Sequence, residues 1–293
     1  MRTRAICCAV LALLVLAVFP AAAFGWCNGP DGPNTFGTHD WVLKEANRLA
    51  AKKHAGWVRL SVALPRTDNP DTIFHDTWYH CYDIWGSHYG NAPRKVAYYY
   101  GKALAARKVG HWRAASRFVG LMAHYYADIC NPLHTDQSDA EEAIHSAYET
   151  AAQDYTDAPG ENRAWVKFNG YTATTNVVRY TKRKAKASHT LYAQLVADYV
   201  ASGMSAGVVT STQKSMNRAA NGLADLIISI KRKVKGVPLT TTSSSATTVY
   251  ITSTGSKYHR GSCSYLASSK IAISLSNAKS KGYTACSVCD PPR

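Results

Sequence analysis

The sequence predicts an all-α domain followed by a small module that contains β-structure. Two long stretches, 190–204 and 212–234, repeat apolar residues at the spacing of an amphipathic helix. No strong strand pattern occurs before residue 240, whereas the segment VYITST at 249–254 alternates as a strand does. Between these patterns lies the Thr/Ser-rich run 240–248, whose low complexity is typical of a linker.

The first residues have the organisation of a secretory signal peptide. Arg2 and Arg4 precede the apolar run 5–19, and small residues stand at the −3 and −1 positions of a cleavage site before Trp26. An uncleaved membrane anchor is the alternative, but the apolar run is short for a spanning helix, and no later segment is long and apolar enough to cross a bilayer. We therefore expect a protein that is secreted or held at the cell surface. The expected segments are a signal peptide (1–25), a helical domain (26–236), a linker (237–248) and a small module (249–293).

The helical domain divides at recognisable start and stop signals. An entry loop rich in Gly, Pro and Asn (26–37) precedes a helix expected over 39–53, with Thr38 as its N-cap. The helix expected over 138–155 begins with the capping box Ser138-x2-Glu141, and the break at 131–132 ends the helix before it. A short apolar piece lies at 60–64, and the basic stretch 171–186 is ambiguous. Further helices are expected over 93–109, 111–130, 190–204 and 212–234.

The chain is strongly basic, with a formal net charge of +15. Removal of Arg2 and Arg4 with the signal peptide leaves +13, since 15 − 2 = 13. Such a charge favours polyanionic partners, either nucleic acid or an anionic membrane surface. A solvated basic surface without a partner explains any single Lys or Arg equally well.

Six cysteines remain after cleavage of the signal peptide. Cys27, Cys81 and Cys130 are an odd number in the helical domain, so at most one disulfide forms there and one thiol stays free. The pairing among them stays open.

The stretch 121–149 carries five potential metal ligands in the order His124-x3-Asp128-x5-His134-x10-His145-x3-Glu149. Two of its pairs are spaced i,i+4, so each pair shares one face of a helix. Imidazole nitrogens and carboxylate oxygens are ligands of zinc sites that keep a position open for water. The stretch is therefore the candidate functional site.

The tail carries a second candidate metal site with a different donor set. A histidine and a cysteine precede a Cys-x2-Cys pair, which is the spacing of a closed structural zinc site. A module of this size is also too small to keep its fold without such a metal site or another cross-link. A disulfide with one thiol left over is the alternative in an exported protein. The predicted ligands are His259, Cys263, Cys286 and Cys289.

The ligand pattern of the helical domain closely resembles the zinc-dependent phospholipase C family, which shares its all-helical fold with the S1/P1 single-strand nucleases. In that family the mature chain begins with a Trp whose amine and carbonyl oxygen bind zinc, and Trp26 stands at the expected cleavage site. His39 follows at the interval seen in bacterial phospholipases, and Asp68 and His80 match the Asp and the His twelve residues apart. The resemblance covers 26–155.

The resemblance implies three zinc ions in the helical domain. The first is held by Trp26, His39 and a bridging Asp128, and the second by Asp128 with Asp68, His80 and His124. The third is held by His134, His145 and Glu149. Together with a structural zinc in the tail, the expected content is about four zinc ions per chain.

The activity that the resemblance implies is hydrolysis of phospholipids at a membrane surface, which gives diacylglycerol and a phosphorylated head group. Asp68 would also orient the attacking water or take its proton. In the family the Asp at this position often follows a Pro. Asp68 has the expected spacing to His80, whereas Asp71 follows Pro70, so Asp71 stays open as the alternative ligand. A monomer is expected.

Two other functions stay open. The long interval between Trp26 and His39, and Glu149 as the last ligand of the pattern, are features of the phospholipases. However, Gly29 stands where bacterial phospholipases have an acidic residue that helps to recognise choline. The tail resembles a module of secreted bacterial nucleases, so a nuclease acting on single-stranded nucleic acid is the first alternative. A secreted metal- or surface-binding protein without catalysis is the second.

Overall fold

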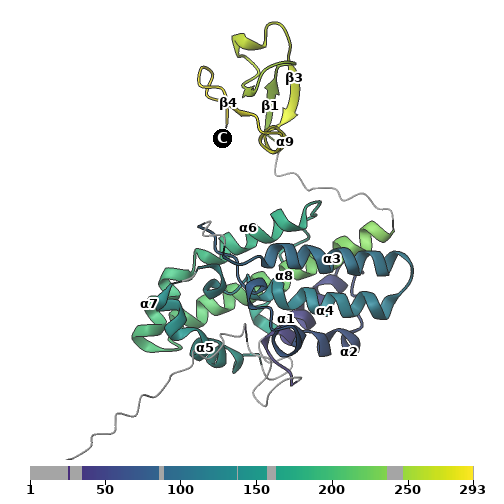
Figure 1. Ribbon diagram of the computed structural model, residues 1–293, viewed down its shortest axis with the longest axis vertical. Helices are drawn as coiled ribbons and strands as arrows, with labels where there is room; N and C mark the ends of the chain where they lie inside the picture. Colours follow the sequence, from purple (N-terminus) through teal and green to yellow (C-terminus); the bar gives the residue numbers. More distant parts are fainter. Residues whose placement is uncertain are drawn as a thin grey trace, which may run out of the picture. The chain divides into compact units, whose positions relative to one another are not determined.

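A computed structural model of the protein describes residues 26, 35–85, 89–136, 138–156, 163–235 and 247–292. The predicted signal peptide (1–25), Cys27, Gly29 and most of the predicted linker (237–248) lie outside these residues. The chain forms two compact units, Met1–Leu239 and Thr240–Arg293, and each is described by itself (Figure 1).

The described part of the first unit is built from α-helices, as the sequence predicts. They are α1 (Thr38–Ala51), α2 (Leu60–Ala63), α3 (Ala92–Lys108), α4 (Trp112–Asp128), α5 (Asp139–Gln153), α6 (Val177–His189), α7 (Tyr192–Ser202) and α8 (Ala206–Val234) (Figure 1). Short turns connect them: η1 (Leu64–Arg66), the π-helical turn η2 (Pro70–Phe74), η3 (Thr77–Tyr79), η4 (Pro132–Thr135) and η5 (Arg163–Trp165). No helix among the described residues combines the length and the apolar composition needed to cross a membrane.

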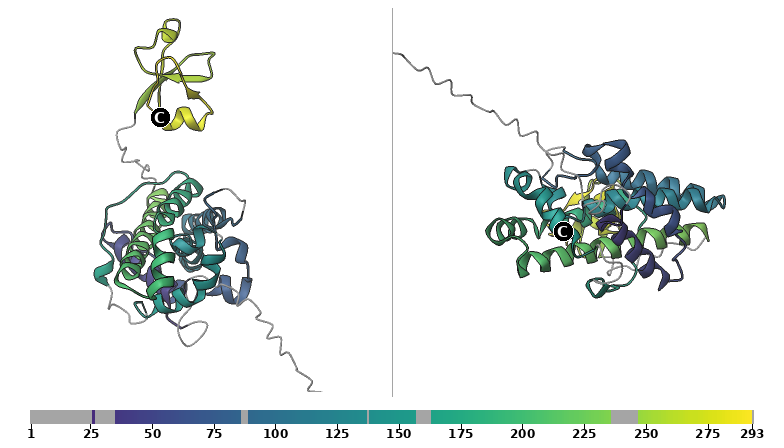
Figure 2. Two further views of the ribbon diagram at one scale, coloured as in Figure 1. Left: turned by 90° about the vertical axis from the view of Figure 1, so that its left-hand side faces the viewer. Right: turned by 90° about the horizontal axis from the view of Figure 1, so that it is seen from below.

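The core of this unit lies among α1, α3, α4 and α8. Helices α3 and α4 pack side by side, and α8 packs against α1, α3 and α4 (Figure 1, Figure 2). Large side chains from these helices are fully buried together, because each helix turns an apolar stripe inward. Among them are Trp41, Leu49, Met122, Tyr126 and Leu226.

Two helix starts differ from the sequence prediction. Gly37, not Thr38, is the N-cap of α1, and its N–H donates to Asp40 Oδ2 at 3.2 Å. Helix α8 begins at Ala206 instead of 212, because Ser205 caps it and its hydroxyl accepts from the Val208 N–H. The ambiguous stretch 171–186 is helical from Val177 onward as α6, capped by the Asn176 side chain.

Gly120 on α4 is required by the close approach of the chain before η1. A Cβ at this position would lie 2.2 Å from the Ala63 carbonyl oxygen, and this backbone atom has little freedom to move. We expect Gly120→Ala to destabilise the protein by about 2 kcal/mol. Thermal and denaturant unfolding measure this, with Gly101→Ala on α3 as control, because nothing lies within 4 Å of the Cβ at that position. Equal stability of the two variants would contradict the packing described for Gly120.

The described part of the second unit is a four-stranded sheet with a short α-helix and the 3-10 turn η6 (Ser264–Leu266). Its strands are β1 (Thr248–Ile251), β2 (Lys257–His259), β3 (Ile271–Ser274) and β4 (Thr284–Ala285), with α9 (Leu275–Ser280) after β3. The strand order is β3-β1-β2-β4, with β1 antiparallel to both neighbours and β2 parallel to β4. The helical unit followed by this sheet-containing unit confirms the predicted fold class.

Candidate metal centre

Helix α4 brings two candidate ligands onto one buried face. His124 and Asp128 are one turn apart near its end, and both are fully buried because α4 packs against α1, α2, α3 and α8. The i,i+4 spacing places His124 Nε2 3.3 Å from Asp128 Oδ2.

Three further side chains reach this pair from other segments. His39, in the first turn of α1, places Nε2 2.9 Å from Asp128 Oδ1. His80, directly after η3, places Nδ1 3.0 Å from Asp128 Oδ2 and 3.4 Å from Asp71 Oδ1. Asp71 Oδ1, on η2, also lies 3.5 Å from His124 Nε2. All five side chains are buried. Asp128 Oδ1 faces His39, and its Oδ2 faces His80 and His124.

A second cluster forms between η4 and α5. His134 Nε2 and His145 Nε2 each lie 3.0 Å from Glu149 Oε1, and the two nitrogens are 3.1 Å apart. The Asn131 amide donates to the same carboxylate oxygen at 2.8 Å. The structure therefore brings together the three ligands expected for a third ion.

The arrangement of these atoms fits bound zinc. Imidazole nitrogens of His80 and His124 face each other at 3.0 Å in a buried position, where two ring nitrogens gain little from one another. Asp128 Oδ2 is buried and forms no hydrogen bond with a described residue, although two ring nitrogens lie near it. Ligand atoms on a zinc ion with bonds of about 2.1 Å lie about 3.4 Å apart, which is close to the distances in both clusters. The N/O donor set is also that of open zinc sites.

Side chains behind the candidate ligands orient their rings. Asp76 Oδ1 lies 3.5 Å from His80 Nε2, and Asp76 in turn accepts from Lys95 Nζ at 2.6 Å and from the Tyr125 hydroxyl at 2.9 Å. Glu141 Oε1 contacts His145 Nδ1. Such outer carboxylates fix which ring nitrogen faces a metal.

Glu141 has a different role from the one the sequence predicts. Ser138 caps α5 and accepts from the Glu141 N–H at 3.3 Å, but the Glu141 side chain turns to His145 instead of completing the capping box. The i,i+4 spacing of Glu141 and His145 is the signal that would have indicated this contact.

Burial and ion pairing oppose each other in both clusters. Burial raises the pKa of Asp128, but neighbouring His124 and His39 more than offset this effect and hold that pKa well below its usual range. Burial lowers the pKa of His80, but its contacts with Asp128 and Asp76 outweigh burial and raise the pKa to about 10. Burial likewise lowers the pKa of His145, yet Glu149 and Glu141 raise it to about 9. The Asp128 carboxylate is therefore ionised, and the His80 and His145 imidazoles bind protons more readily than usual. Both effects mean that these buried positions stabilise positive charge, as a cation site does.

The remaining predicted site residues of the helical unit lie as follows. Asp68 is fully buried, and its Oδ1 lies 3.4 Å from Thr67 Oγ1. The described groups of possible metal ligands contain Asp71 with His39 and His124, and Asp128 with His80 and His124, but not Asp68. Trp26 is fully buried in the same core as Trp41. Cys81 and Cys130 are buried thiols that are not joined to each other, and Cys81 Sγ lies 3.6 Å from His134 Nδ1.

The four predicted ligands of the tail converge in the second unit. His259 ends β2, and its Nδ1 lies 3.2 Å from Cys263 Sγ and 4.0 Å from Cys289 Sγ. The ligand atoms of these residues and Cys286 lie within 4.8 Å of one another. The Arg260 N–H donates to Cys289 Sγ at 3.3 Å, a contact that stabilises a thiolate.

Comparisons with known proteins agree with the helical architecture. No protein-family model matches the sequence, and no curated protein matches it either. Among solved structures, the alpha toxin from Clostridium absonum matches with a TM-score of 0.53 and 18% identity over 75% of this chain and 70% of that chain. The alpha-toxin of an avian strain of Clostridium perfringens matches with a TM-score of 0.51 and 15% identity over 74% of this chain and 69% of that chain. The chain therefore has the fold of the clostridial alpha-toxins, the fold of the zinc phospholipases C that its ligand pattern resembles.

Proposed function

We propose that the protein is a secreted, zinc-dependent phosphodiester hydrolase of the phospholipase C type. The observation that carries this proposal is a buried carboxylate, Asp128, whose Oδ1 faces His39 and whose Oδ2 faces His80 and His124, beside a separate cluster of two imidazoles and Glu149. Two metal ions bridged by a carboxylate and a third ion nearby suit hydrolysis of a phosphodiester.

Residues of the helical unit provide a proposed set of ligands for each of three zinc ions. Asp128 would bridge the first two ions, with His39 and the Trp26 amine and carbonyl on one side and His80 and His124 on the other. His134, His145 and Glu149 would hold the third. Because the Trp26 amine is free only after signal cleavage, export completes the first site under this proposal. The tail holds one further, structural zinc.

Asp71 is the better candidate for the ligand role that the sequence predicts for Asp68. Its Oδ1 lies 3.4–3.5 Å from nitrogens of both His80 and His124. Burial raises the pKa of Asp71, but His124 and His80 outweigh burial and lower the pKa, so the carboxylate is ionised.

Different residues of the site would have different roles in the hydrolysis of the phosphodiester. Zinc ions bound in these clusters supply an activated water and offset charge on the phosphoryl oxygens. Asp128, His80 and His124 would hold one of these zinc ions, and Asp76 keeps the His80 ring oriented. Asp71 orients the attacking water and takes its proton. The products are an alcohol, diacylglycerol for a phospholipid, and a phosphorylated head group.

Exposed apolar side chains beside the ligands favour a lipid substrate. Within the described residues, five of the twelve large hydrophobic side chains that are exposed belong to 73–89, the segment that contains His80. They are Ile73, Phe74, Trp78, Trp85 and Tyr89. Exposed aromatic and aliphatic side chains gathered in one segment mark an interaction site and suit a membrane interface.

Replacing Asp71 with asparagine is expected to lower kcat/KM about 1,000-fold and to release one zinc ion, because an amide is a poor zinc ligand and a poor proton acceptor. Asp68→Asn is the matched control, with an expected loss of about tenfold or less. Steady-state kinetics and metal analysis measure both variants. The opposite order of the two losses would return the ligand role to Asp68.

A parallel assay tests the proposed function. Purified mature protein is offered phospholipid micelles and single-stranded DNA, each with and without a chelator. Release of diacylglycerol that stops with the chelator supports the proposal. Turnover of DNA alone would favour the nuclease alternative, which the positive net charge and the Cys/His tail also support. Absence of turnover on both would favour a binding protein.

A further inference from the structure

A basic hollow of about 420 Å³ opens on the helical unit beside α6. Its walls come from the start and middle of α6 and from the segment after η3. The residues that define it are Tyr82, Asn176, Arg179, Lys182, Arg183 and Lys186.

Four of these side chains form one cationic face, which we name the α6 face: Arg179, Lys182, Arg183 and Lys186. Their spacing is i, i+3, i+4 and i+7, so they project from the same side of the helix, and all four are exposed. The ion pairs that lysines and arginines form within the described residues use Arg48, Lys95 and Arg163 instead. No acidic residue lines the hollow. The α6 face is therefore an unneutralised positive surface.

Tyr82 connects this hollow to the second metal cluster. Its N–H donates to the carbonyl oxygen of His134 at 2.9 Å, and the neighbouring Cys81 Sγ lies 3.6 Å from His134 Nδ1. Helix α6 also packs against η4, the turn that carries His134. On the opposite wall, Lys182 Nζ lies 4.9 Å from the centroid of the Tyr82 ring. The α6 face thus lies next to a ligand of the third proposed zinc ion.

We propose that the α6 face is the subsite for the head group of an anionic phospholipid, one that carries no ammonium group. This inference rests on the proposed function. Four unpaired cations repel the ammonium of a choline or ethanolamine head group and attract a phospholipid with net negative charge. Nucleic acid is also anionic, but the exposed Ile73 and Phe74 beside Asp71 suit acyl chains.

The test uses monomeric substrates, so that binding to a lipid surface does not obscure recognition of the head group. Short-chain phosphatidylglycerol and phosphatidylcholine are offered below their critical micelle concentrations. We expect the wild-type protein to favour phosphatidylglycerol about tenfold in kcat/KM. We expect Lys182→Glu/Arg183→Glu to bring the ratio close to one, mainly through a higher KM for phosphatidylglycerol, with zinc content unchanged.

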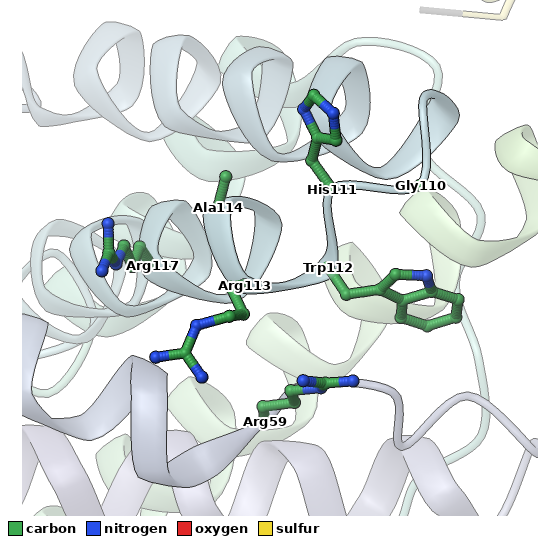
Figure 3. Close-up of a pocket in the computed structure, with 7 residues that line it drawn as sticks. All are labelled: Arg59, Gly110, His111, Trp112, Arg113, Ala114 and Arg117. Carbon is green, nitrogen blue, oxygen red and sulfur yellow. The ribbon is translucent and has the colours of Figure 1, made fainter.

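A second basic hollow supplies the matched control. It has a volume of about 520 Å³ and is lined by Arg113 and Arg117 near the start of α4 and by Arg59, the N-cap of α2 (Figure 3). Arg113 precedes His124 by eleven residues on the same helix, which is about 16 Å along its axis. Arg113→Glu/Arg117→Glu changes the net charge by the same amount and is expected to leave the ratio unchanged. An equal fall in both double variants would overturn the subsite, because the effect would then belong to net charge alone.

The outcomes separate the inference from the function on which it rests. If neither lipid is hydrolysed, the proposed function fails. If both lipids are hydrolysed and the wild-type ratio is near one, the function stands and the subsite is wrong. Loss of single-stranded DNA cleavage in Lys182→Glu/Arg183→Glu, with an unchanged lipid ratio, would assign the α6 face to nucleic acid instead. Should the charge reversals unfold the protein, Lys182→Gln/Arg183→Gln tests the same ratio, with an expected fall of about threefold.

Discussion

Replacing Asp128 with alanine is expected to lower kcat/KM by about 1,000-fold or more and to release two of the three zinc ions proposed for the helical unit. The reason is its position: Oδ1 lies 2.9 Å from His39 Nε2, and Oδ2 lies 3.0 Å from His80 Nδ1. Loss of one side chain therefore removes a ligand from two sites at once. Metal analysis and steady-state kinetics on the purified variant measure both effects.

Asp76→Asn is the matched control for this prediction. Asp76 contacts the outer nitrogen of His80 and no other candidate ligand, so the zinc content is expected to stay the same while activity falls about 10- to 100-fold. An Asp128→Ala variant that keeps all its zinc, or that loses no more activity than Asp76→Asn, would show that Asp128 is not a bridge.

Removal of zinc is expected to abolish activity and to lower the Tm of the helical unit by about 10 °C. The clusters place five imidazoles and three carboxylates in fully or almost fully buried positions, where bound cations would satisfy them. Differential scanning calorimetry with and without a chelator measures the shift, and added zinc is expected to restore both Tm and activity. An unchanged Tm would mean that the buried groups hold the fold without metal.

The second unit is expected to respond to the chelator separately. Its main apolar cluster contains only Val249, Ile251, Tyr258 and Ala278 as buried residues, so we expect the fold to depend on a zinc ion held by the Cys/His ligands. After chelation, proteases should cleave within 247–292. His259→Ala/Cys263→Ala should show the same cleavage in the presence of zinc while it keeps activity on monomeric lipid. Loss of that activity would place the tail in the catalytic machinery.

Helical periodicity explains why part of the site was visible in the sequence. The pairs His124/Asp128 and His145/Glu149 are each one turn apart, and a helix puts such residues on one face whatever surrounds it. In the structure both pairs lie on helices, α4 and α5, and both are buried.

The segment before His80 shows where sequence reasoning stops. Asp68 fits the interval of twelve residues, but the chain there passes through a π-helical turn and a left-handed residue, His75 with φ 50°. Side-chain direction in such turns follows no simple period, so spacing does not indicate which carboxylate points inward. The structure places Asp71 beside His80 and His124.

By itself, the sequence determined the helical character of the first unit, the small sheet-containing tail and the residue types of both clusters, because these depend on local periodicity and composition. Only the tertiary structure decided that His39 meets Asp128 across 89 residues of sequence and that Glu141 faces His145 instead of capping α5. The reason is physical. Which face of a helix is apolar is a local property, whereas the partner that covers it depends on how α1, α3, α4 and α8 bury their apolar faces together.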